Sequence, residues 1–129
     1  MQTPILSLHA PKPIGPYSQA MKVGNLIFIS GQIALDPKTG ALNNKNLETE
    51  TKCVLDNLNA ILSAAGCTLA DVAKTTLYLT DMNDFSLVNS IYATYFTDHK
   101  PARSCIEVSR LPKGVRIEIE AVAVIPLSL

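Results

Sequence analysis

The sequence predicts an α+β fold, a two-layer sandwich in which two helices cover one face of a six-stranded mixed sheet. Several short runs are rich in β-forming residues or alternate apolar and polar positions, as strands do. Two longer stretches instead repeat apolar residues every three or four positions, as helices do. These stretches follow the order ββαβαββ, with one more short strand expected in the N-terminal arm. At 129 residues the chain has the length of one domain, so we expect residues 1–129 to form a single unit.

The first strands follow an extended arm, residues 1–13, which holds three of the eight prolines. A short strand is expected at 5–8 and two further strands at 18–23 and 26–30. Gly24 and Asn25 separate the latter two, and these residue types tolerate the positive φ of a two-residue hairpin turn. Gly31 follows at once, where the missing side chain lets another group approach the backbone closely.

The two helices are expected at 47–65 and after Asp81 or Asn83, either of which can cap a helix. Gly66 is a typical C-terminal cap for the first helix, and a buried strand is expected between the helices at 72–80. The second helix ends near Pro101. The apolar stripes are Leu47, Val54, Leu55, Leu58, Ile61, Leu62 and Ala65 in the first helix, and Phe85, Val88, Tyr92, Tyr95 and Phe96 in the second.

The last two strands are expected at 103–108 and 115–124. Residues 109–114 between them contain a proline and a glycine, and this pattern predicts a hairpin with a longer loop. The face of the last strand that carries its glutamates also carries Val122 and Val124. These valines would face water in a monomer, so the sequence indicates closed self-association through this second sheet face.

The predicted hairpin brings an arginine, a thiol and two carboxylates to one surface, because alternate strand residues share a face. Arg103 would lie opposite Glu120, and Cys105 opposite Glu118. The fixed fork of an arginine suits a carboxylate or phosphate, and a neighbouring glutamate can act as a general base toward water. An ordinary alternative is that Arg103 is a surface residue paired with a glutamate and that both glutamates are solvent-facing charges.

Other candidates are weaker on their own. Cys105 either lines the site or is a reactive thiol whose pKa a nearby guanidinium would lower. Tyr17 stands beside a rigid Gly-Pro pair, and Ser30 ends a strand just before Gly31. His9 and His99 show no spacing typical of metal ligands, so no metal is expected.

Composition excludes several classes of function. Eleven basic and eleven acidic residues cancel, which leaves no electrostatic signal for a nucleic-acid backbone or an anionic membrane. No apolar run approaches the roughly 18 to 20 residues of a membrane span, and the N-terminus does not read as a secretory signal. Three widely spaced cysteines indicate a reducing compartment, so we expect a cytoplasmic protein.

Several motifs closely resemble one known family along essentially the whole chain. In the C-terminal part these are PARSC (101–105), RLPK (110–113) and IEIEA (117–121). The earlier ones are IGPYSQ (14–19), SGQI (30–33), DPKTG (36–40), LDN (55–57) and KTT (74–76). Together they resemble the RidA family, also called YjgF or endoribonuclease L-PSP.

The resemblance implies a chorismate-mutase-like fold assembled as a homotrimer, with sites in the clefts between subunits. The implied activity is hydrolysis of 2-iminobutanoate or 2-iminopropanoate to the 2-oxo acid and ammonia, with no cofactor. Arg103 matches the arginine that holds the substrate carboxylate, and Glu118 matches the glutamate that positions water, with Glu120 as second choice. Tyr17, Ser30, Gly31 and Cys105 match residues that line the pocket.

Two other classes of function stay open at this stage. The older family name points to RNA cleavage, which the neutral charge and the lack of an RNA-binding aromatic motif do not favour. The protein could also be a non-enzymatic trimer that senses or sequesters 2-oxo or amino acids, or a stress-induced holdase.

Overall fold

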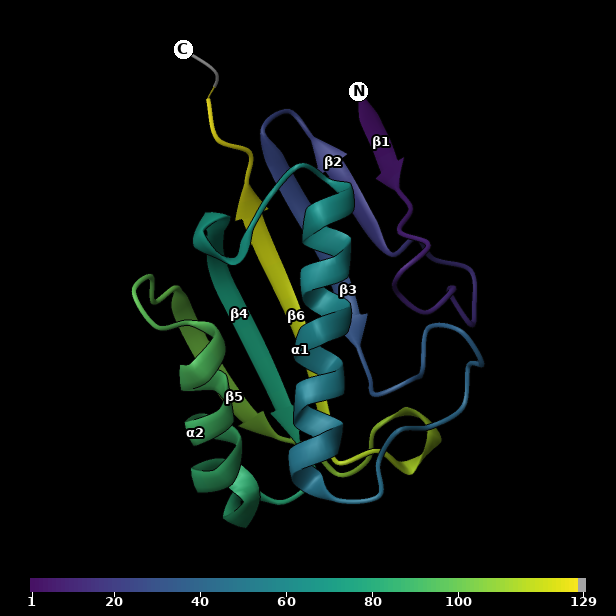
Figure 1. The fold of residues 1–129 in the computed structure, drawn as a ribbon, viewed down its shortest axis with the longest axis vertical. Coiled ribbons are helices and arrows are strands. Elements are labelled where there is room, and N and C mark those ends of the chain that lie inside the picture. The colour runs from purple at the N-terminus through teal and green to yellow at the C-terminus, as the bar shows by residue number, and fades with distance from the viewer. Residues whose placement is uncertain (128–129) are drawn as a thin grey trace.

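A computed structural model describes residues 1–127 and contains a six-stranded sheet with two α-helices packed against one face (Figure 1). The predicted α+β sandwich is confirmed. The strand order across the sheet is β1-β2-β3-β6-β4-β5. The elements are β1 (Gln2–Ile5), β2 (Ala20–Val23), β3 (Leu26–Gln32), α1 (Leu47–Ala64), β4 (Val72–Leu79), α2 (Phe85–Tyr95), β5 (Ala102–Glu107) and β6 (Ile117–Val124).

The sheet is mixed because β4 and β5 run parallel while every other neighbouring pair is antiparallel. The chain passes from β4 through α2 to β5, which is a βαβ crossover. The last strand, β6, then lies between β3 and β4 in the centre of the sheet (Figure 1). The predicted hairpin between the last two strands is therefore wrong: β4 separates β5 from β6.

Local signals account for the ends of α1. The Asn46 side chain accepts a hydrogen bond of 2.8 Å from the Thr49 amide, and Gly66 beyond the helix has a φ of 78°. Both are standard helix caps. The apolar stripe of α1 packs on the sheet, with Val54, Leu58 and Ile61 fully buried.

The N-terminal strand and both ends of the second helix differ from the prediction, and α2 ends at Tyr95 and not near Pro101. The N-terminal strand is Gln2–Ile5 and not 5–8, and it pairs antiparallel with β2. Asp81 caps a short 3-10 turn, Met82–Asp84, by accepting from the Asn83 amide, and α2 begins only after that turn. The two-residue turn at Gly24 and Asn25 is confirmed, because Val23 pairs with Leu26 and Gly24 has a φ of 61°.

The sheet face away from the helices carries exposed apolar side chains. Phe28 and Ile106 are 44% and 45% exposed, and Val122 pairs with Phe28 in the centre of this face. We call this surface the open face. In the part of the chain that the structure describes, no helix is long and apolar enough to cross a membrane.

Candidate active site

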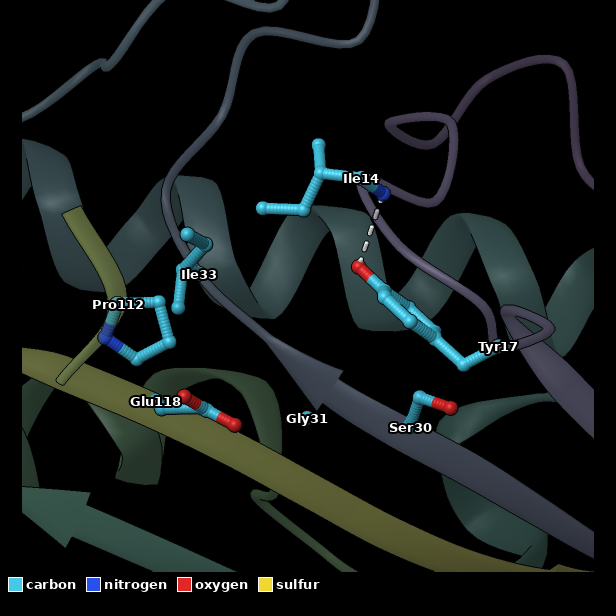
Figure 2. A pocket seen from close by; sticks show the side chains of 7 residues that line it. All are labelled: Ile14, Tyr17, Ser30, Gly31, Ile33, Pro112 and Glu118. Atoms are coloured by element: carbon cyan, nitrogen blue, oxygen red, sulfur yellow. Dashed lines mark hydrogen bonds between the residues drawn. The ribbon is translucent and has the colours of Figure 1, made fainter.

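A cavity of about 360 Å³ lies where the open face meets the loop before β2 and the turn before β6. Figure 2 shows its lining, which comes from three parts of the chain that are far apart in sequence. The lining residues are Ile14, Tyr17, Ser30, Gly31, Ile33, Pro112 and Glu118. Four of the residues predicted for the site, Tyr17, Ser30, Gly31 and Glu118, are therefore brought together here.

A β-bulge shapes the floor of this pocket. Ile29 pairs with Ala121 and Gln32 with Ile119, so Ser30 and Gly31 together face the single residue Glu120. A bulge bends the strand and redirects its side chains. Here the Ser30 amide donates to the Gln19 carbonyl at 2.9 Å and its hydroxyl donates to the Ser18 carbonyl at 2.7 Å. The bulge is thus tied to the segment that precedes β2.

Gly31 lies directly beside the Glu118 carboxyl group (Figure 2). A Cβ atom added at Gly31 would overlap Oε2 of Glu118 and would lie only 2.8 Å from its Cδ. Gly31 has no positive φ, so the need for glycine comes from the close approach and not from the backbone conformation.

The Glu118 carboxyl group has an unusual proton affinity. Partial burial raises its pKa above the ordinary value, and the negative charge of Glu120 raises it further. Glu120 itself is exposed on the open face and accepts a hydrogen bond of 3.1 Å from the Tyr78 hydroxyl. Raising the pKa of a carboxylate makes it a stronger proton acceptor, and general acid-base chemistry requires a group that accepts a proton and returns it.

Tyr17 forms the side of the pocket facing solvent, and its side chain is 46% exposed. Its hydroxyl oxygen accepts a hydrogen bond of 3.2 Å from the Ile14 amide (Figure 2). This bond closes the short loop that carries both residues. The tyrosine ring and the Ile14 side chain therefore form one rim of the cavity.

Arg103 and Cys105 do not join this pocket within one chain. In the parallel pairing Arg103 lies beside Thr75 and Cys105 beside Leu77, and both of these β4 residues are buried beneath the helices. Glu118 and Glu120 instead pair with Tyr78 and Thr76 on the open face. The prediction that the arginine, the thiol and the two glutamates share one surface of a single chain is therefore wrong.

Helix α2 holds Arg103 at the edge of the sheet. Nη1 of Arg103 donates to Oδ1 of Asn89 at 2.7 Å, and the guanidinium carbon lies 4.9 Å from the Tyr92 ring centroid and 5.5 Å from that of Phe85. Such contacts orient an arginine while its remaining donors stay free. The sequence prediction missed Asn89, although its position four residues after Phe85 and three before Tyr92 puts it on the same helix face.

Cys105 is a free, partly buried thiol. Burial raises its pKa, and the nearby Arg103 charge lowers it by less. The predicted effect of the guanidinium is present but is outweighed by desolvation. Among residues 1–127 the structure contains no cluster of three or more His, Cys, Asp or Glu residues that could hold a metal ion.

Comparison with known proteins identifies the family. A family model described as endoribonuclease L-PSP matches residues 7–125. The chain belongs to this family. A RutC family protein of Pyrococcus horikoshii is 58% identical over 95% of this chain and 98% of its own length. The 2-iminobutanoate/2-iminopropanoate deaminase of Escherichia coli is 48% identical over 96% of this chain and 98% of its own length.

Solved structures of the L-PSP family share the fold. A Thermotoga maritima protein superposes with a TM-score of 0.94 at 52% identity, over 96% of this chain and 98% of that one. Escherichia coli TdcF, solved with bound serine, superposes with a TM-score of 0.90 at 42% identity, over 95% of this chain and 98% of that one. At least one family member thus binds a small amino acid.

Proposed function

We propose that this protein hydrolyses 2-iminobutanoate and 2-iminopropanoate, and their enamine tautomers, to 2-oxo acids and ammonia. The observation that carries the proposal is the Glu118 carboxyl group, with its raised pKa, set against Gly31 in a cavity of about 360 Å³. The E. coli relative named 2-iminobutanoate/2-iminopropanoate deaminase supports this choice of substrate.

In the proposed reaction Glu118 positions a water molecule against C2 of the imine. The carboxylate accepts one proton as the water oxygen bonds to C2, and it passes that proton to the imine nitrogen to give a carbinolamine. The hydroxyl proton then moves to the same nitrogen as the C–N bond breaks and the carbonyl forms. The imine hydrogen and the two water protons thus leave as ammonia, and the reaction requires no oxidant and no organic cofactor.

In this proposal the substrate carboxylate is held by Arg103 of a neighbouring copy. The seven residues that line the cavity include no cation, and Arg103 of the same chain lies on the opposite face of the sheet. The apolar open face provides a surface for a second copy to cover. We therefore propose a cytoplasmic homotrimer whose sites lie at the junctions between copies.

The remaining predicted site residues have supporting roles in this proposal. Tyr17, Ser30 and Gly31 line the substrate from the pocket, and Cys105 lines it from the neighbouring copy, beside that copy's Arg103. Glu120 is the second choice for positioning water, because it adjoins the bulge on the same face as Glu118.

A second candidate is a ligand-binding protein without catalysis, and the serine bound to TdcF favours it. Such a protein would need the pocket and the arginine but not a proton acceptor. The two functions therefore differ in what they require of Glu118.

A coupled assay separates them. Threonine dehydratase generates the imine in the presence of semicarbazide, and the trapped semicarbazone is measured with and without this protein. We expect the protein to reduce the trapped fraction and expect Arg103→Ala to abolish the effect. Glu118→Gln should still bind 2-oxobutanoate but lose about 10²- to 10⁴-fold in rate. A Glu118→Gln protein as active as the parent would reject the proposed mechanism, and an inactive parent that binds 2-oxobutanoate would favour the second candidate.

A further inference from the structure

Two buried polar side chains on α1 lie outside the pocket and are not accounted for by the proposed reaction. Glu50 is fully buried and Asn57 is 2% exposed. They are seven residues apart, nearly two helical turns, so both lie on the helix side that packs on the sheet. A buried polar group is costly unless it is hydrogen-bonded. The hydrogen-bond partners of Glu50 and Asn57 therefore indicate what these two residues do.

The Glu50 carboxylate binds the chain directly before Glu118. Its Oε2 accepts from the backbone amides of Arg116 at 2.7 Å and Ile117 at 3.2 Å. Its Oε1 accepts from Nε of Arg116 at 2.7 Å, and Nη2 of Arg116 donates to the Asn44 carbonyl at 2.8 Å. Two of the three bonds to Glu50 thus come from the backbone at the entry to β6.

Asn57 binds the segment that follows the bulge. Its Nδ2 atom donates to the Leu35 carbonyl at 3.0 Å and to the Ile33 carbonyl at 3.4 Å. The Ile33 side chain lines the pocket, two residues after Gly31 (Figure 2). Helix α1 therefore binds the segment that follows β3 and the segment that leads into β6, and both segments adjoin the cavity.

We propose that Glu50 and Asn57 are positioning residues of the pocket: Glu50 sets the place of Glu118 over Gly31, and Asn57 sets the place of the Ile33 wall. This inference rests on the proposed deaminase function. Stability alone accounts poorly for the fully buried Glu50 carboxylate, because burying a charge beside an arginine that is itself 38% exposed contributes little compared with well-packed apolar residues. Geometry accounts for it better, since the Glu118 carboxyl group packs against Gly31 with no spare room.

The substitution Glu50→Gln tests the first half of the proposal. Glutamine has nearly the same shape, but its amide NH₂ cannot accept the hydrogen bonds that one carboxylate oxygen accepts. We expect kcat to fall about 10- to 100-fold with KM within about twofold, because Glu118 is misplaced while the substrate still binds. Initial rates would be measured on imine generated in situ, well below the melting temperature of each variant.

Glu48→Gln is the matched control on the same helix. Glu48 is exposed, and within residues 1–127 its side chain bonds only that of Lys52, at 2.8 Å, so kcat and KM of the Glu48→Gln protein should equal those of the parent. The substitution Asn57→Leu tests the second half. It should raise KM several-fold with a smaller change in kcat, because the Ile33 wall contacts the substrate and not the attacking water.

Several outcomes decide the proposal. A Glu50→Gln protein that melts at a lower temperature but keeps the parent kcat would show that Glu50 has only a structural role, and this result would overturn the proposal. If that variant does not fold, Glu50→Asp keeps both oxygens but shortens the side chain, and an unchanged kcat in it would overturn the proposal equally. If the parent itself is inactive, the proposed function fails separately. A crystal structure of Glu50→Gln then decides: displacement of the Glu118 carboxyl group from Gly31 supports the positioning role, and an unmoved carboxyl group rejects it.

Discussion

At the scale of single residues, the contact between Gly31 and Glu118 leaves no space for a larger side chain at position 31. We expect Gly31→Ala to push the Glu118 carboxyl group out of its position, because the new methyl group would occupy the space of Oε2. Overpacking of this kind costs roughly 1–3 kcal/mol of unfolding free energy. Deamination should fall at least about 100-fold, since a displacement near 1 Å already has that effect. Steady-state kinetics and thermal melting measure the two effects.

Gly24→Ala is the control for this substitution. Gly24 has a φ of 61° and nothing within 4 Å of its added methyl group, so its cost is backbone strain of about 1–2 kcal/mol. We expect the control to lose stability while keeping its kcat. Equal kcat in the Gly31→Ala protein and the parent would contradict the role given to this contact.

The raised pKa of Glu118 also predicts how stability depends on pH. The folded protein holds the Glu118 proton more tightly than the unfolded chain, whose glutamate pKa is near 4.5. Stability from this residue therefore falls as the pH rises from that value through the raised pKa. Glu118→Gln removes this loss, so it should melt at a higher temperature than the parent at pH 8, with the difference shrinking towards pH 4. A melting difference that does not change between these pH values would contradict the burial of this carboxyl group.

At the scale of secondary-structure elements, α2 acts as the support for Arg103. We expect Asn89→Ala to release the guanidinium from the 2.7 Å bond and to raise KM for the imine, because a free arginine must be ordered again on binding. A rise of roughly two- to tenfold corresponds to the loss of one ordinary hydrogen bond. The adjacent Ser90 hydroxyl donates to the Leu87 carbonyl of the same helix and contacts no other described residue by a hydrogen bond, so Ser90→Ala should leave KM unchanged. An unaltered KM in Asn89→Ala would show that the aromatic rings alone orient Arg103.

The elements themselves were largely predictable from the sequence, whereas their pairing was not. Apolar spacing and caps placed α1 within one residue of its observed end, because those signals are local. The error over the last two strands came from treating a turn-rich segment as evidence for a hairpin. A strand, a helix and a strand in succession, as in β4, α2 and β5, favour a parallel pair, and this signal was present in the predicted order.

The residues that line the pocket could be predicted from the sequence less directly. Tyr17, Ser30, Gly31 and Glu118 were singled out mainly by the family resemblance. They meet because a bulge in β3 places Gly31 against the Glu118 side chain of the neighbouring strand β6. A bulge depends on the register between strands that are almost ninety positions apart in the chain, so no local pattern reveals it. Helical spacing places Asn89 on one face with Phe85 and Tyr92, but the contact of Asn89 with Arg103, and that of Glu50 with the segment before Glu118, follow only from the three-dimensional structure.

At the scale of the whole molecule, the open face and the proposed division of the site between copies point to the same assembly. Phe28 and Ile106 expose apolar surface on the face that carries Glu118, while Arg103 lies on the other face of the sheet, at its β5 edge. A closed symmetric assembly would cover this apolar surface and bring Arg103 to the pocket of a neighbouring copy. Phe28→Asp should therefore yield a folded protein of smaller native mass that no longer deaminates, as size-exclusion chromatography with light scattering and the coupled assay would show.

Mixing two inactive variants tests the division of the site directly. Arg103→Ala keeps Glu118, and Glu118→Gln keeps Arg103, so a junction that takes Glu118 from the first variant and Arg103 from the second is complete. After the two proteins are unfolded and refolded together in equal amounts, random assembly completes about one junction in four, because each of the two independent choices is correct half the time. We expect about a quarter of the parent activity from the mixture and none from either protein refolded alone. If both variants enter the same oligomers and the mixture stays inactive, Arg103 and Glu118 do not act across a junction, and the arginine has another role.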